Sequence, residues 1–164
     1  MYMYVRPGMQ EFLEECHPHF ELILYSNGSQ HYTESVLTKL KETVAIKSYF
    51  EHVLCREQCS VNDKGHEIKN LEFFTGAGSG RDIRDCIVID NSIYCYQNHL
   101  TSGLFVPNYN FSDSNDDWLN VLRMYLLDRF ITKQRDSDED LPDVRMLIGR
   151  DMRIEEVFAL STVS

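Results

Sequence analysis

The segment Cys86-Ile87-Val88-Ile89-Asp90-Asn91-Ser92 decides the fold, because an uninterrupted apolar run leads directly into polar turn residues. A short apolar run of this kind is typical of a strand buried on both faces, as in a parallel sheet. A second run, Phe20-Glu21-Leu22-Ile23-Leu24-Tyr25, leads into Ser26-Asn27-Gly28, and residues 52–55 form a third short apolar segment. Buried strands that alternate with helices predict an α/β fold, with a parallel sheet flanked by helices.

Helical patterns lie between these strands and after them. The first predicted helix follows Pro7, and the second is capped by Ser29. Ser114 and Asp117 have the spacing of a capping box at the start of a third helix, and residues 144–160 form a last amphipathic segment. The apolar positions of the first three helices are Met9, Phe12, Leu13 and Cys16, then Tyr32, Val36, Leu37 and Leu40, then Trp118, Val121, Leu122, Tyr125 and Leu126.

The chain has 164 residues, which is enough for one domain with a substantial core. We expect an α/β domain over residues 1–132, an acidic linker over residues 133–143 and a helical segment over residues 144–164 that packs on the domain. The expected linker contains the charged run from Arg135 to Pro142, which is typical of a solvated connection.

Composition and charge disfavour some classes of binding partner and indicate the type of cellular compartment. The formal net charge is -10, which disfavours binding to nucleic acid or to an anionic membrane surface. No apolar run reaches the roughly 18 residues that a membrane span needs. The five cysteines form no Cys-x-x-Cys pair, so we expect free thiols, rather than zinc or disulfides, in a reducing intracellular compartment. The pattern leaves nucleus, cytoplasm and mitochondrion open.

Three places near the ends of predicted elements could carry chemistry: Ser26, Lys69 and the pair Asp90-Asn91. The carboxyl ends of parallel strands are where open α/β folds bind ligands, so these side chains are expected to face one cleft. A hydroxyl beside helix-start amides suits a phosphate oxygen, a lysine suits its charge, and an Asp-Asn pair offers the hard oxygens that Mg²⁺ prefers. A turn hydroxyl, a surface lysine and a post-strand turn are the structural alternatives.

Other candidate motifs favour structural interpretations. The glycine-rich segment 76–80 lacks the Gly-Lys-Ser/Thr of a nucleotide loop, and Asp136 and Asp138 lie in a charge run. The six histidines show no catalytic spacing and are interpreted as surface or packing residues.

Several blocks of the sequence resemble the NLI-interacting-factor-like phosphatases, a family of the haloacid dehalogenase superfamily that includes the small phosphatases of the RNA polymerase II C-terminal domain. These blocks keep the family order over roughly residues 4–130. The most specific block is Gly80-Arg81-Asp82-Ile83-Arg84, which continues to Ile89-Asp90-Asn91-Ser92. The other blocks are Arg6-Pro7-Gly8, Leu24-Tyr25-Ser26-Asn27-Gly28, Leu54-Cys55-Arg56-Glu57-Gln58-Cys59 and Ile68-Lys69-Asn70-Leu71.

The resemblance implies a haloacid-dehalogenase-like, Rossmann-like fold and a role for each matching residue. Ser26, Asn27 and Lys69 would bind the phosphoryl group of a phosphoserine or phosphothreonine protein, and Asn91, supported by Asp90, would bind Mg²⁺. The residues implied to contact the substrate are Tyr32 and Arg56.

One departure from the family is large. Family catalysis uses an Asp-x-Asp-x-Thr/Val segment on the first, central strand, and residues 1–164 contain no such segment. We therefore expect no catalytic aspartate and an inactive chain as given, through truncation, a split gene or a mistaken start. A partner chain or a separately encoded segment is expected to supply the missing strand.

The alternative is a non-catalytic pseudophosphatase that acts as a structural or interaction subunit of a larger assembly. Receptors of the mitochondrial inner-membrane translocase also resemble this fold and can work by binding other chains.

Overall fold

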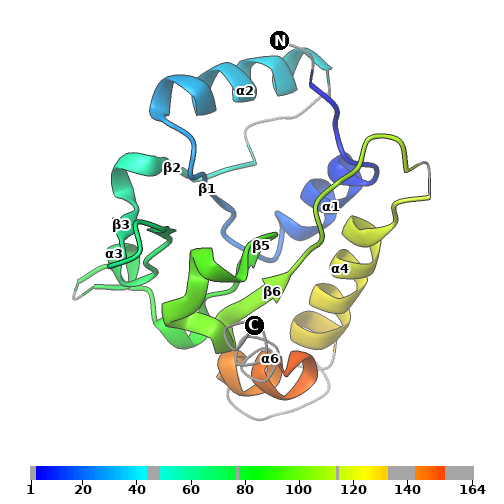
Figure 1. Ribbon diagram of the computed structural model, residues 1–164. Helices are drawn as coiled ribbons and strands as arrows, with labels where there is room; N and C mark the ends of the chain where they lie inside the picture. Colours follow the sequence, from blue (N-terminus) through cyan, green and yellow to red (C-terminus); the bar gives the residue numbers. More distant parts are fainter. Residues whose placement is uncertain (1–2, 44–48, 77, 114, 133–142, 154–164) are drawn as a thin grey trace. The chain divides into compact units, whose positions relative to one another are not determined.

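The computed structural model describes residues 3–43, 49–76, 78–113, 115–132 and 143–153 (Figure 1). The chain forms two compact units. Unit 1 consists of Met1–Glu57 and Asn108–Glu139, and unit 2 consists of Gln58–Pro107 and Asp140–Ser164. The domain boundaries expected at residues 132 and 143 stay predictions, and residues 133–142 of the expected linker lie outside the described part.

Unit 1 contains the first two predicted strands as a parallel pair. Strand β1 (Ile23–Tyr25) pairs with β2 (His52–Leu54), with Ile23 opposite His52 and Tyr25 opposite Leu54. Helix α2 (Gln30–Thr43) connects the two strands on the chain, as a parallel pair requires of its crossover. Strand β1 is shorter than the predicted run 20–25, because only its last three residues join the ladder.

Helices α1 (Met9–Cys16) and α4 (Trp118–Leu127) pack against each other in unit 1. Their buried residues follow the predicted periodicity: Leu13 and Cys16 on α1, and Leu122 and Leu126 on α4. Helix α4 begins at Trp118, so Asp117 is its N-cap residue and not the third residue of a capping box that starts at Ser114, and its side chain makes no capping bond. Ser114 lies outside the described residues. After α4 the chain continues in a π-helical turn, η4 (Asp128–Thr132).

Two ion pairs connect the first part of unit 1 with α4 and the residues just before it. The Arg6 guanidinium donates from Nε and Nη2 to the two carboxylate oxygens of Asp116, at 2.8 and 2.7 Å. Arg123 on α4 pairs with Glu15 on α1. Burial raises the pKa of the Cys16 thiol between these helices to about 11, so Cys16 is a protonated core residue at neutral pH.

Unit 2 contains a second parallel pair and an antiparallel hairpin. Strand β5 (Val88–Asp90) pairs in parallel with β6 (Gly103–Phe105), and the connection between them is η3 (Ile93–Ser102), a 3-10 segment. Strands β3 (Ser60–Val61) and β4 (Glu67–Ile68) form the hairpin, whose turn places Gly65 at a φ of 80°. The sequence patterns predicted β5 and the turn at residues 63–65 but not β6, η3 or the hairpin.

Short helical segments complete unit 2. They are α3 (Glu72–Thr75), η2 (Ile83–Asp85) and α6 (Val144–Met152). Helix α6 starts where the last amphipathic segment was predicted, and Asp143 caps it by accepting from the N–H of Arg145 at 3.0 Å. It packs on η2, η3 and β6, and Ile148 on its inner face is fully buried. Residues 154–160 of the predicted segment lie outside the described part.

The two parallel strand pairs and the helices around them confirm the predicted α/β class. Among the described residues, each of the three sheets has two strands. No described helix combines the length and the apolar character that a membrane span requires. The five cysteines all lie among the described residues and are free thiols in the structure.

The core of unit 2 is built around Tyr96, whose side chain is completely buried. Its ring lies directly over Gly103 at the start of β6, and a Cβ at Gly103 would overlap three atoms of that ring. Leu71 and Val88 are the other buried members of this cluster, and Phe74, Ile83, Cys86, Ile93, Leu100 and Met152 pack around it. Gly103 is therefore required for the packing of the ring rather than for its own backbone angles.

We expect Gly103→Ala to lower the free energy of unfolding by about 2 kcal/mol or more, because a tightly packed ring must shift to admit the methyl group. Urea denaturation followed by circular dichroism measures the change. Gly76→Ala is the matched control, since the nearest atom to its added Cβ is 3.7 Å away, and it should change stability by less than about 0.5 kcal/mol. Equal stability of the two variants would contradict the packing argument.

Candidate functional site

Two of the predicted site residues form a buried ion pair in unit 2. The Lys69 ammonium group bonds to Oδ2 of Asp90, and only 8% of Lys69 and 9% of Asp90 is exposed. Asp90 is the last residue of β5, and Lys69 directly follows β4. The structure thus brings together two side chains that are 21 positions apart in the sequence.

Local backbone bonds hold both partners in place. The second carboxylate oxygen of Asp90, Oδ1, accepts from the N–H of Ser92 at 2.7 Å, which closes a turn just after β5. The backbone N–H of Lys69 donates to the carbonyl of Cys95 in η3 at 2.7 Å. A backbone N–H therefore holds the Asp90 carboxylate, and a backbone hydrogen bond holds the main chain at Lys69. The ion pair between the two side chains adds to both.

The arrangement around Asp90 does not provide a Mg²⁺ site by itself. Both oxygens of Asp90 already accept hydrogen bonds, one from Lys69 and one from Ser92. Asn91, the other predicted ligand, is exposed beside it. Within the described ranges, no three His, Cys, Asp or Glu side chains are grouped so that they could hold a metal ion. A Mg²⁺ ion here would need oxygen ligands beyond this pair.

The other predicted phosphate contacts, Ser26 and Asn27, lie in unit 1, in the loop between β1 and α2. Ser26 Oγ accepts from the N–H of Gly28 at 2.9 Å, and the N–H of Ser26 donates to Leu54 of β2 at 2.9 Å. The loop ends directly at the first turn of α2, where backbone N–H groups and the helix dipole favour an anion.

Arg56 also holds this loop in place, through two hydrogen bonds to its carbonyl groups. Its backbone N–H donates to the carbonyl of Gly28 at 2.9 Å, and its Nε donates to the carbonyl of Asn27 at 2.9 Å. The neighbouring Glu57 carboxylate accepts from the N–H of Gln30, the first residue of α2, at 3.3 Å. Arg56, predicted as a substrate contact, therefore has a structural role in this loop, and its contact with a substrate stays a prediction.

Gly28 leaves no space for a side chain. A Cβ there would lie 2.7 Å from Cδ1 of Tyr32, 3.1 Å from Oγ of Ser26 and 3.3 Å from Oγ1 of Thr33. The Thr33 residue is 3% exposed, and its hydroxyl has no hydrogen-bond partner among the described residues. Sequence patterns missed Thr33, because a threonine within a helix carries no signal of its own. Tyr32, the other predicted substrate contact, is exposed on α2.

Ser26 and the Lys69–Asp90 pair belong to different units. Each half of the predicted site has a defined geometry within its own unit. The prediction that both halves face one cleft stays a prediction.

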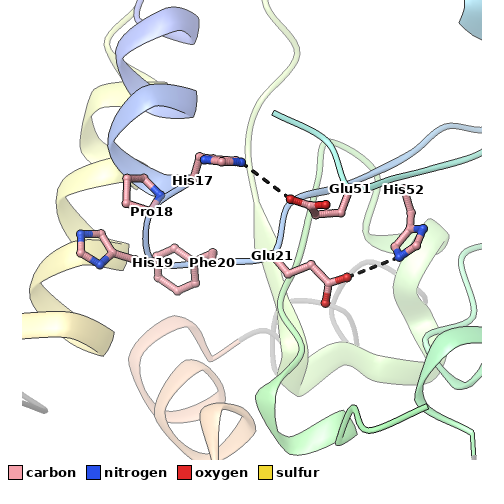
Figure 2. Close-up of a pocket in the computed structure, with 7 residues that line it drawn as sticks. All are labelled: His17, Pro18, His19, Phe20, Glu21, Glu51 and His52. Atoms are coloured by element: carbon pink, nitrogen blue, oxygen red, sulfur yellow. Dashed lines mark ion pairs between the residues drawn. The ribbon is translucent and has the colours of Figure 1, made fainter. Parts of the chain in front are cut away.

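Unit 1 contains a pocket of about 450 Å³, and Figure 2 shows the side chains that line it. It is lined by His17, Pro18, His19, Phe20, Glu21, Glu51 and His52. Two ion pairs cross it: His17 with Glu51 at 3.8 Å, and His52 with Glu21 at 3.5 Å. Because these residues precede β1 and β2 or begin them, the pocket lies at the amino ends of the parallel strands, away from the Ser26 loop.

Comparison with known proteins identifies the class of this α/β chain as phosphatase-like. Residues 1–138 match the NLI interacting factor-like phosphatase family. The chain belongs to this family, which confirms the resemblance seen in the sequence blocks.

Curated relatives agree with this assignment. The chain is 33% identical over 119 residues to Phosphatase PSR1 of Saccharomyces cerevisiae, covering 73% of this chain and 25% of the relative. It is 30% identical over 122 residues to CTD small phosphatase-like protein 1 of Caenorhabditis elegans, covering 74% and 23%. With CTD nuclear envelope phosphatase 1B of Danio rerio it shares 27% identity over 154 residues, covering 92% and 54%.

The chain therefore spans only about a quarter of the length of the first two relatives. Among solved structures, the fission yeast RNA polymerase II CTD phosphatase Fcp1 aligns with a TM-score of 0.45 and 17% identity. That alignment covers 96% of this chain and 47% of the other.

We expect Lys69→Met to destabilise the protein by about 3 kcal/mol, because it leaves the Asp90 carboxylate buried without its counter-charge. The double variant Lys69→Met/Asp90→Asn should recover much of this loss, since the introduced amide is uncharged and its oxygen can still accept from the N–H of Ser92. Urea denaturation of the single and double variants measures the coupling. Lys64→Met, at an exposed turn lysine, is the control and should be near neutral. Independent, additive effects of the two substitutions would refute the coupling of the pair.

Proposed function

We propose that this chain is a phosphoserine/phosphothreonine protein phosphatase-like domain that recognises the phosphoryl group of a phosphoprotein. The observation that carries the proposal is the buried Lys69–Asp90 pair, at the positions where the family places its phosphate lysine and its Asp-Asn motif. A lysine fixed by a carboxylate presents its charge at a defined point, which suits charge neutralisation in phosphoryl transfer. The Ser26 loop at the start of α2 supplies a hydroxyl suited to a phosphate oxygen.

The same residues support binding better than turnover. The aspartyl-phosphate route requires a carboxylate that can attack phosphorus, and residues 1–164 contain no Asp-x-Asp-x-Thr/Val segment. Asp90 is a poor substitute for that nucleophile, because its carboxylate is buried and paired with Lys69. We therefore propose that residues 1–164 alone do not catalyse hydrolysis.

A second candidate function is a non-catalytic interaction subunit of a larger assembly. The specific observation in its favour is that Lys69 and Asp90 satisfy each other, so losing either one alone destabilises the fold whether or not a phosphoryl group is ever bound. Sequencing the upstream coding region in the native transcript discriminates the two candidates. An in-frame Asp-x-Asp-x-Thr/Val segment before Met1 supports the phosphatase, and its absence supports the interaction subunit.

Purified residues 1–164 should not hydrolyse p-nitrophenyl phosphate or a phosphoserine peptide above background with Mg²⁺ present, because the nucleophile is missing. Inorganic phosphate should still bind weakly and shift the NMR signals of Lys69 and of the Ser26 loop. Lys69→Arg should retain binding, since it keeps the charge, and Lys69→Met should lose it. Lys64→Met is the control and should bind as the unmodified chain does.

Two results would contradict this proposal. Magnesium-dependent turnover that disappears in Lys69→Met would show that another residue attacks phosphorus. Phosphate shifts that survive in Lys69→Met would show that Lys69 does not recognise the ligand.

We further propose that a partner chain or a separately encoded segment supplies an additional strand beside the parallel strands of this chain. Within each unit, the parallel sheet formed by the described residues has two strands, β1 with β2 and β5 with β6, which supports this proposal. An edge without a partner strand exposes backbone donors and acceptors that favour pairing with another extended segment.

Light scattering and amide exchange of residues 1–164 test the strand proposal. The expected result is self-association, or fast exchange at Leu22–Leu24 and Ile87–Ile89 that slows when the partner segment is added. A stable monomer in which these amides are strongly protected would refute it, because the edges would then already be paired.

A further inference from the structure

The segment that carries Lys69 is attached to η3 at two points. The first is the bond from the N–H of Lys69 to the carbonyl of Cys95 at 2.7 Å. The second is a bond from the N–H of Leu71, two residues further on, to the ring atom Nε2 of His99 at 3.3 Å. These two bonds bracket Lys69 and Asn70, so η3 determines the path of the backbone that carries the site lysine.

The shape of η3 makes this double attachment possible. Its backbone departs from helical angles at Tyr96 (φ -127°, ψ 27°) and at His99 (φ -139°, ψ 44°). Tyr96 is held in the core against Gly103, which anchors the first of these breaks. The second break lies at the residue whose ring contacts Leu71. η3 is thus two short helical pieces rather than one continuous helix.

The ring atom Nε2 of His99 faces two groups of opposite character. Besides the N–H of Leu71, it lies 3.2 Å from Oδ1 of Asn70. That amide oxygen also accepts from the N–H of Glu72 at 3.0 Å, which identifies it as an acceptor. A single imidazole nitrogen either accepts a hydrogen bond or donates one. Nε2 can therefore satisfy Leu71 or Asn70 at a given moment, but not both.

We propose that His99 is a positioning residue for Lys69. It holds the Lys69-Asn70-Leu71 segment through either of two alternative hydrogen bonds, which we call its two grips. When Nε2 carries no proton, it accepts from the backbone N–H of Leu71. When Nε2 is protonated, it releases that N–H and donates instead to Oδ1 of Asn70. The link to phosphate recognition rests on the proposed function of Lys69, whereas the exchange between the two grips does not.

The surroundings of His99 favour the neutral ring at neutral pH, which is the form in which Nε2 can accept from the N–H of Leu71. Burial lowers the pKa of His99, which stabilises the neutral ring. Two charged groups face it from neighbouring elements: Glu72 of α3 raises the pKa, and Arg145 of α6 lowers it. Acidification should therefore switch Nε2 from Leu71 to Asn70 at a pH below the usual range for histidine.

Three variants in the full chain test the grip. His99→Gln keeps an acceptor near the position of Nε2 without a titrating group, whereas His99→Leu removes the acceptor. Asn98→Ala, at the exposed neighbouring position, is the control. Amide hydrogen exchange at Leu71 should accelerate about tenfold or more in His99→Leu and stay within about threefold in His99→Gln and Asn98→Ala.

A pH titration followed by NMR separates this role from mere packing. In the unmodified chain, the Leu71 amide shift should change with pH at the same midpoint as the His99 ring signals. In His99→Gln that step should disappear while Leu71 stays protected. A Leu71 signal that ignores His99 titration, or equal Leu71 exchange in the unmodified chain and His99→Leu, would overturn the proposal. Even if His99→Leu does not fold, the pH titration of the unmodified chain tests whether Leu71 responds to His99.

Inorganic phosphate titration then distinguishes this inference from the proposed function. Weaker binding in His99→Leu, by about fivefold or more, with normal binding in His99→Gln would support positioning of Lys69 for its ligand. Normal binding in His99→Leu would overturn that role. If phosphate binds to none of the proteins, including the unmodified chain, the proposed function fails, and the exchange and pH measurements still decide the two grips of His99.

Discussion

Unit 2 depends on one electrostatic constraint: the ammonium group of Lys69 is buried and needs the Asp90 carboxylate beside it. Several elements meet this constraint together. Strand β5 ends at Asp90, and β4 ends just before Lys69. The Cys95 carbonyl of η3 accepts a hydrogen bond from the backbone N–H of Lys69. The pair therefore links the hairpin, the parallel strands and the kinked connection between them.

Much of this architecture could be predicted from local patterns. The apolar runs at residues 20–25 and 86–89 mark strands, because a short continuous apolar run is typical of a parallel sheet. Burial on both faces was predicted wrongly, since β1 is half-buried and Ile89 of β5 is exposed. Helices α1, α2 and α4 were predictable from the spacing of apolar residues. Asp90 was found because it ends a recognisable strand and matches a family motif, and Lys69 was found because it matches a family motif.

The rest could not be predicted, for identifiable physical reasons. η3 has no 3.6-residue periodicity, since it is a 3-10 segment broken at two residues. Strand β6 begins with Gly103, a residue that normally weakens strands, and only the buried ring of Tyr96 explains it. His99 contacts Asn70 and Leu71 through the fold and is inconspicuous in the sequence. The position of Ser26 relative to Lys69 was likewise not predictable from patterns within either unit, because the two residues belong to different units.

The mutual satisfaction of Lys69 and Asp90 has an evolutionary consequence. Losing either residue alone leaves a charge buried in the protein, so purifying selection for stability acts on both even where catalysis has been abandoned. A lineage could drift through loss of its nucleophile while these two positions remain unchanged for many generations. Retention of this lysine and this aspartate in a homologue is thus a record of folding requirements and a poor diagnostic of enzymatic competence.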